Sequence, residues 1–192
     1  MANVNAPRGF RPVRYADGKP YMGAMNRYYI TGIVLGVGDP VVRLTASADP
    51  LGGPQVVRAS TGSYITGVVV GFEPLRNSLT EVGYSLTGDS TYVYVADEPD
   101  LLFEVQEGGS STALAVTDIG NCINSVTALN ADTTIGSSKY QIDNGAKGSG
   151  DTWFLVELVQ RADNALGKYA KWIVQPSLHT QVNAGAANIL AI

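Results

Sequence analysis

The sequence predicts an all-β protein, built as a single β-barrel or jelly-roll-like sandwich with an extended N-terminal arm and a C-terminal tail. Two observations lead to this prediction. The 192 residues include 22 glycines, and only 16% of the chain is charged while 45% is hydrophobic, which favours many turns between short strands over long, charged helices. Apolar residues also alternate with other residues along several short stretches, and this is the period of a β-strand.

Turn-forming residues divide the chain into an arm over residues 1–20, a body over 21–176 and a tail over 177–192. Residues 112–116 fit a strand or one helical turn, and a turn is expected over 144–150. The last two strands of the body are expected to pair. Strands are predicted in the body at Met25–Val37, Val41–Thr45, Gln55–Ala59, Tyr64–Phe72, Ser138–Asp143, Trp153–Gln160 and Tyr169–Val174.

The stretch Thr91–Glu107 is expected to be the centre of the fold. Aromatic and β-branched residues alternate over Thr91–Ala96, and a second alternating run covers Leu101–Gln106. The segment between the two runs is acidic and contains Pro99, which fixes φ and removes a backbone donor. We therefore predict a hairpin in which the second strand pairs back on the first.

The arm is basic and interrupted by prolines and glycines, so it is expected neither to form a helix nor to build a core of its own. Three uses stay open: a clamp onto a partner, a disordered terminus or strap across its own domain, and a holder for single-stranded nucleic acid. The candidate partner contacts in the arm are Arg8, Phe10, Arg11, Arg14 and Tyr15.

The tail ends in large apolar residues. Burying each one contributes roughly 1.5 to 3 kcal/mol, which a solvated tail would forfeit, so we expect this end to dock on its own domain or on a neighbouring subunit. The candidate contacts are Leu178, Ile189, Leu190 and Ile192. The single histidine, His179, also lies in the tail and is expected to be an exposed polar residue.

The charge is distributed unevenly along the chain. Five basic residues and one acid occur through residue 30, whereas from Asn77 to Ser138 there are nine acids and no Lys or Arg. Because phosphate groups are contacted largely by Lys and Arg, the body is not expected to bind nucleic acid. No apolar run suits a signal peptide or a membrane span, so a soluble protein with no membrane partner is expected.

The residue types offer little catalytic chemistry. One cysteine, Cys122, allows no internal disulfide and is expected to be a small buried hydrophobe. One histidine allows no multi-histidine zinc site, and no GxSxG, GxxxxGK[ST] or HExxH motif occurs. The sequence therefore predicts no catalytic, cofactor-binding or metal-binding residue, and no enzyme activity.

One acidic cluster offers an alternative to that prediction. Asp97, Glu98 and Asp100 could bind a cation or, together with Glu104, serve as the acid and base of a glycosidase. Their spacing lacks the separated ligands and the glycine of a calcium loop, and Asp and Pro are ordinary turn formers. The interpretation as a turn is preferred.

Three stretches, NAPRGFRPVRYADGKP, YVYVADEPDLLFEVQE and WFLVELVQRADNALGKYAKWIVQP, resemble a family of small virion proteins of tailed bacteriophages. Members of that family are encoded beside the major capsid protein and are known or presumed head cement (decoration) proteins. The resemblance implies a β-barrel or jelly-roll-like body on the capsid exterior, made in the host cytoplasm. It also implies a homo-oligomer, a trimer or dimer, whose extended ends staple neighbouring subunits of the major capsid protein.

Two other functions remain open at this point. A carbohydrate- or receptor-binding β-domain of a head fibre or tail accessory protein would use Tyr92, Tyr94 or Trp153 as exposed stacking platforms. An enzyme would use the carboxylates from Asp97 to Glu104.

Overall fold

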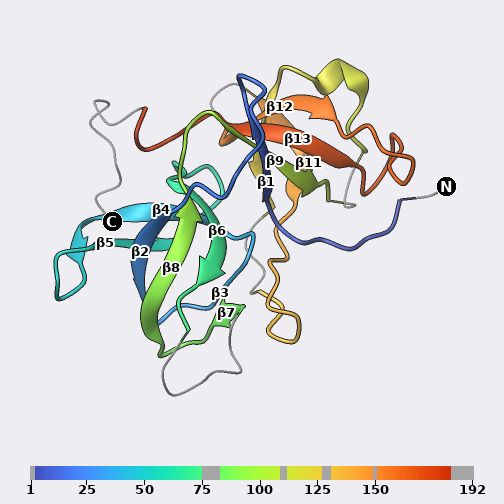
Figure 1. Ribbon diagram of the computed structural model, residues 1–192. Helices are drawn as coiled ribbons and strands as arrows, with labels where there is room; N and C mark the ends of the chain where they lie inside the picture. Colours follow the sequence, from blue (N-terminus) through green and yellow to red (C-terminus); the bar gives the residue numbers. More distant parts are fainter. Residues whose placement is uncertain (1–2, 75–82, 109–111, 127–130, 149–150, 183–192) are drawn as a thin grey trace.

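The computed structural model describes residues 3–74, 83–108, 112–126, 131–148 and 151–182, and in these ranges the fold is all-β. A closed five-stranded barrel lies beside a six-stranded sheet, and β1 stands at the boundary between them (Figure 1). One short 3-10 helix, η1 (Val116–Asp118), begins at the last residue of the segment 112–116, whose other residues form neither the strand nor the helical turn expected there. The predicted all-β class and the barrel are confirmed.

The barrel is formed by five strands in the order β2-β5-β4-β6-β8. Neighbouring strands are antiparallel except for β2 and β5, which run parallel. A separate two-stranded sheet pairs β3 (Leu35–Gly36) with β7 (Tyr84–Ser85). The barrel strands are β2 (Asn26–Thr31), β4 (Pro40–Ala48), β5 (Pro54–Arg58), β6 (Gly67–Phe72) and β8 (Ser90–Ala96).

The six-stranded sheet is antiparallel, with the order β1-β9-β13-β12-β10-β11. All barrel strands lie between β1 and β9 in the sequence, so the barrel is an insertion into the sheet. The predicted pairing of the last two strands is confirmed. The sheet strands are β1 (Arg11–Tyr15), β9 (Leu101–Gln106), β10 (Cys122–Ser125), β11 (Ile142–Gly148), β12 (Trp153–Leu158) and β13 (Lys171–Pro176).

Two large hydrophobic cores, and a small cluster of Leu102, Val159 and Ile173, follow from the alternation of side chains along the strands. The first fills the barrel and includes Ile30, Val56 and Val93. The second lies between the barrel and the sheet, because it contains Val68 of the barrel together with Trp172 of the sheet. The two halves of the molecule therefore share a core.

A carboxyl group is buried in the sheet next to this shared core. Glu107 is fully buried, and its Oε2 accepts hydrogen bonds from Trp172 Nε1 at 3.0 Å and from the Leu114 amide at 3.2 Å. Burial disfavours the charged form and raises the pKa of Glu107 above its ordinary value, although these donors act in the opposite direction.

The predicted hairpin over Thr91–Glu107 is wrong. β8 pairs with β2 and β6 in the barrel, whereas β9 pairs with β1 and β13 in the sheet. The reason lies in the acidic segment between them. Asp97 is buried and accepts hydrogen bonds from Asn26 Nδ2 and Tyr28 Oη, which hold the end of β8 on the barrel. The segment that follows carries the chain across to the sheet.

The strand predicted at Ser138–Asp143 and the turn predicted over residues 144–150 are also misplaced, because β11 runs from Ile142 to Gly148. Residues 138–140 are held by the barrel instead. The Ser138 amide donates to the Val37 carbonyl at 2.9 Å, and Tyr140 Oη donates to the Ala59 carbonyl at 2.8 Å. Long-range contacts thus displaced a strand that local alternation favoured.

A bulge changes the faces of β12. Simple alternation would put Phe154, Val156 and Leu158 on one face, but the register shifts between Leu155 and Glu157. Leu158 therefore packs against the shared core, while Phe154 is exposed.

The segment after β13 returns to the barrel, so the prediction that His179 is exposed is wrong. The His179 ring is buried, with Nε2 at 2.9 Å from the Thr66 carbonyl, and its Nδ1 accepts from the Gln181 amide at 3.2 Å. Burial lowers the pKa of His179, although the Thr66 carbonyl acts to raise it. Cys122, expected to be buried, is half-buried, with Sγ 3.5 Å from Ser177 Oγ.

Candidate interaction surface

The N-terminal segment lies on the chain's own sheet. Asn3 binds the loop between β12 and β13, donating to the Ala165 carbonyl at 2.7 Å and accepting from the Ala165 amide at 3.0 Å. Gln106 on β9 binds the backbone of Val4 and Ala6, both at 3.1 Å. Of the uses left open for the arm, this arrangement corresponds to a strap across its own domain.

Phe10 is the anchor of this strap. Its ring is 1% exposed and stacks on Trp153, with the ring centroids 4.0 Å apart and the planes 16° apart. The Phe10 amide also donates to the Gly38 carbonyl at 2.9 Å, at the edge of the barrel. Phe10 therefore ties the strap to both halves of the molecule, and its side chain is not available to a partner as proposed.

The residue before the anchor must be glycine. Gly9 has a φ of +67°, and a side chain at this position would overlap the Gly38 carbonyl and the Ser138 side chain. Only glycine adopts this backbone conformation at such close approach without strain. The strap thus crosses the barrel edge in a fixed path.

The other candidate contacts in the arm differ in how exposed they are. Arg8 and Arg11 are exposed on either side of the Phe10 anchor. Arg14 is paired with Glu157 at 2.6 Å, and Tyr15 is half-buried against the shared core.

Leu178 is half-buried, and its carbonyl accepts from the Ile65 amide at 2.8 Å. This bond ties the start of the tail to the chain's own barrel. Ile189, Leu190 and Ile192 lie outside the described residues.

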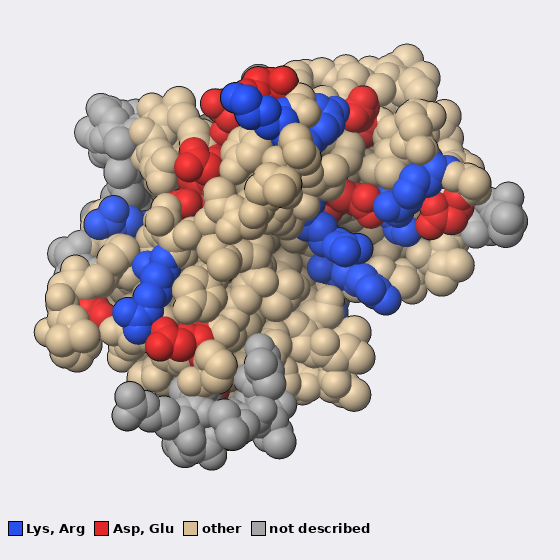
Figure 2. Space-filling view, in the orientation of Figure 1, with Lys and Arg blue, Asp and Glu red and all other residues tan. Residues whose placement is uncertain are grey.

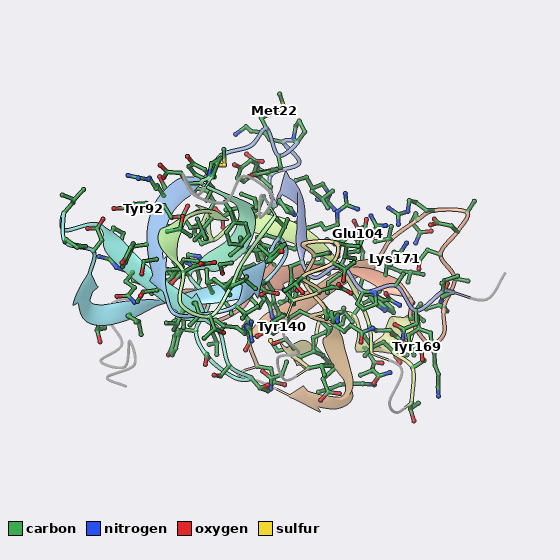
Figure 3. All side chains as sticks on the ribbon, turned by 90° about the horizontal axis from the view of Figure 1, so that it is seen from below. Met22, Tyr92, Glu104, Tyr140, Tyr169 and Lys171 are labelled. Carbon is green, nitrogen blue, oxygen red and sulfur yellow. The ribbon has the colours of Figure 1, made fainter. Side chains whose placement is uncertain are left out.

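Ion pairs cover the solvent-facing side of the sheet. Arg161 forms two hydrogen bonds with the Glu104 carboxylate, at 2.9 and 3.1 Å, and contacts Asp163 at 3.1 Å. Lys171 lies 3.4 Å from the same Asp163. Burial acts to lower the pKa of Arg161, but the two carboxylates outweigh it and raise the pKa. Figure 3 shows Glu104 and Lys171 close together beside the strap.

A hollow of about 230 Å³ opens between the strap and this row of ion pairs. We call it the arginine hollow; its charged lining residues are Arg8, Arg11, Glu104, Arg161 and Lys171. They come from the strap, from β1, β9 and β13, and from the loop before β13. Figure 2 shows basic side chains grouped near the middle of the face, where the strap meets the sheet.

The sequence singled out Arg8 and Arg11 but missed Arg161 and Lys171 as parts of this hollow. Their positions depend on the pairing of β9 with β1 and β13, which places Arg11 opposite Glu104 and Lys171 opposite Gln106. No local pattern in the sequence signals this register.

The proposed stacking platforms are largely occupied. Trp153 is fully buried. Tyr92 is half-buried, its ring is covered by the Arg27 guanidinium at 3.4 Å from the centroid, and its hydroxyl donates to Asp49. Tyr94 is half-buried as well.

The acidic cluster is split between structural roles. Asp97 binds side chains of β2, and Glu104 is bound by Arg161. Among the described residues, no group of three or more His, Cys, Asp or Glu side chains could hold a metal ion.

Comparison with known proteins finds no matching protein family, curated protein or solved structure. In the described part of the chain, no helix is long and apolar enough to span a membrane.

Proposed function

We propose that this chain is a structural virion protein that binds the outer surface of a phage capsid, cements neighbouring subunits of the major capsid protein and performs no catalysis. The observation that carries the proposal is the strap, whose exposed arginines are held in fixed positions on a rigid β body by a buried phenylalanine. This is a surface suited to contact. The resemblance of the strap sequence to head cement proteins points to the same partner.

The mechanism we propose is the addition of contact area across subunit boundaries. A barrel and a sheet that share one core form a body with little freedom to deform, so contacts on its surface resist relative movement of the subunits beneath it. Binding to the assembled shell and not to its separated subunits stabilises the shell, by about 2.7 kcal/mol per site when the free protein is at a hundred times its Kd. Many copies on one shell act together.

We further propose that the protein acts as a homo-oligomer, a trimer or dimer, on the capsid exterior. Light scattering of the full chain should give the mass of a defined dimer or trimer. A monomer at all accessible concentrations would contradict this part of the proposal and leave capsid binding to be tested by itself.

The direct test uses empty shells assembled from the major capsid protein. The protein should cosediment with the shells up to a fixed number of copies per subunit, and decorated shells should withstand higher temperature or urea concentration than bare shells. Absence of cosedimentation at a large excess of protein, or equal stability of the two kinds of shell, would overturn the proposal. Binding to a glycan array instead would favour the receptor-binding alternative.

A further inference from the structure

The arginine hollow has an excess of positive charge in a protein whose formal net charge is −4. Its four cationic groups face two carboxylates, those of Glu104 and the adjacent Asp163. Arg161 pairs with both carboxylates, and Lys171 pairs with that of Asp163. Within the described ranges, the side chains of Arg8 and Arg11 form no ion pair or hydrogen bond. The hollow therefore carries more positive than negative charge, and the guanidinium groups of Arg8 and Arg11 lie outside its ion pairs.

These two guanidinium groups project from a backbone that is held in place. Arg8 and Arg11 flank the buried Phe10, whose amide is bound to the barrel, and Arg11 begins the strand that pairs with β9. Ordering a flexible segment on binding costs free energy. Since this segment is ordered before any partner arrives, that cost is reduced to the ordering of two side chains.

The chemistry favours a carboxylate as the ligand. A planar guanidinium forms paired hydrogen bonds with a carboxylate, and two such groups can hold acidic side chains of one short segment. A nucleic acid is a poorer fit because the chain has a formal net charge of −4 and carries nine acidic residues and no Lys or Arg from Asn77 to Ser138. Repulsion by these groups opposes a long polyanion more than a short acidic peptide.

We propose that the arginine hollow binds an acidic segment of a partner protein, with Arg8 and Arg11 as the groups that hold its carboxylates. The inference deepens the proposed function and rests on it for the choice of a protein as the partner. It assigns the contact to the strap and the β1 edge of the sheet, and it makes the contact sensitive to salt.

A peptide titration tests the hollow with no capsid present. The probe is a fluorescently labelled peptide of four Glu-Ala-Gly repeats, titrated with the full chain to millimolar concentration at low ionic strength. The test variant is Arg8→Glu with Arg11→Glu, and the control is Lys19→Glu with Lys139→Glu, which makes the same change in net charge. The control lysines are paired with Asp17 and Asp132, outside the hollow.

Binding of the acidic peptide should weaken about tenfold or more in the arginine variant and less than about twofold in the control. Circular dichroism establishes that both variants are folded. If the test variant is not, Arg8→Ala with Arg11→Ala replaces it, and Lys19→Ala with Lys139→Ala becomes the control with the same change in net charge. The proposal is overturned if the native chain does not bind the peptide, or if the control loses as much affinity as the test variant. Tighter, arginine-dependent binding of a twelve-nucleotide oligothymidine would also overturn it, in favour of nucleic acid.

The shell assay separates this inference from the proposed function. If the arginines bind the peptide but the protein does not bind shells, the proposed capsid partner is wrong and the proposed binding site in the hollow is retained. If the arginine variant binds shells as tightly as the native chain, the proposed capsid partner is retained, but the hollow is not the surface that contacts it.

Discussion

Replacing Phe10 by alanine should destabilise the isolated protein strongly, because the strap is part of the protein's own core. The ring is 1% exposed and lies stacked 4.0 Å from the ring of Trp153. Removing a buried phenylalanine costs about 3 to 5 kcal/mol, a figure that includes the cavity left behind. Loss of the aromatic pair accounts for about 0.5 to 1.5 kcal/mol of this. Such a loss is a large fraction of the 5 to 15 kcal/mol typical of a whole domain.

The assay is equilibrium unfolding in urea followed by tryptophan fluorescence, since Trp153 itself reports on the site. The midpoint should fall while the slope of the transition stays unchanged, which marks a change in stability without a change in the area exposed on unfolding. Val4→Ala is the matched control, because Val4 lies in the same segment but is 74% exposed; it should change stability by less than about 0.5 kcal/mol. A decrease in the free energy of unfolding below about 1 kcal/mol for Phe10→Ala, or one equal to that of the control, would refute the reasoning. The segment would then be a clamp that does not pack on its own domain.

Three further predictions concern buried groups and one glycine. Relative to Glu107→Gln, the native protein should lose stability as the pH rises above about 4.5, because burial raises the pKa of Glu107 and ionisation is penalised only in the folded state; parallel pH profiles in urea melts would contradict this. Relative to His179→Gln, the native protein should lose stability as the pH falls below about 6.5, because the lowered pKa means that the unfolded chain takes up the proton more readily; a native profile that is flat relative to the variant between about pH 7 and pH 5 would count against the buried ring. Gly9→Ala should cost at least about 2 kcal/mol, from the positive φ together with overlap with the barrel edge, whereas Gly18→Ala, with positive φ but open space around it, should cost only about 1 to 2 kcal/mol. An equal fall in melting temperature for the two glycine variants would show that the strap at Gly9 does not pack closely against the barrel edge.

Local patterns were sufficient to predict the fold class and the closing pair of strands. In β12 and β13, alternating apolar residues separated by a short polar loop are enough to predict two strands that pair. The pattern failed where contacts distant in sequence decide the outcome. The segment after β8 has the composition of a hairpin turn, but hydrogen bonds from Asn26 and Tyr28 to Asp97 fix the end of β8 on the barrel and make the segment a crossover.

The candidate surface was predictable only in part. The arginines of the strap stand out in the sequence because they interrupt a proline-rich segment. The sequence could not show that Phe10 among them is buried, because its partner Trp153 lies more than a hundred residues away. Likewise, the burial of His179 depends on the return of the chain to Thr66, which no local pattern indicates.

The insertion of the barrel between β1 and β9 has a consequence for biosynthesis. The barrel is continuous in sequence from Asn26 to Ala96 and can close as soon as it leaves the ribosome, but β1 must wait until β9 has been made. At about 5 to 20 residues per second, the roughly ninety intervening residues take about 5 to 20 seconds to synthesise. The Phe10 ring waits longer still, because its stacking partner Trp153 follows about 140 residues later, which takes about 7 to 28 seconds at the same rate. Until then the ring has no pocket, so this interval is when a nascent chain most needs protection by a chaperone.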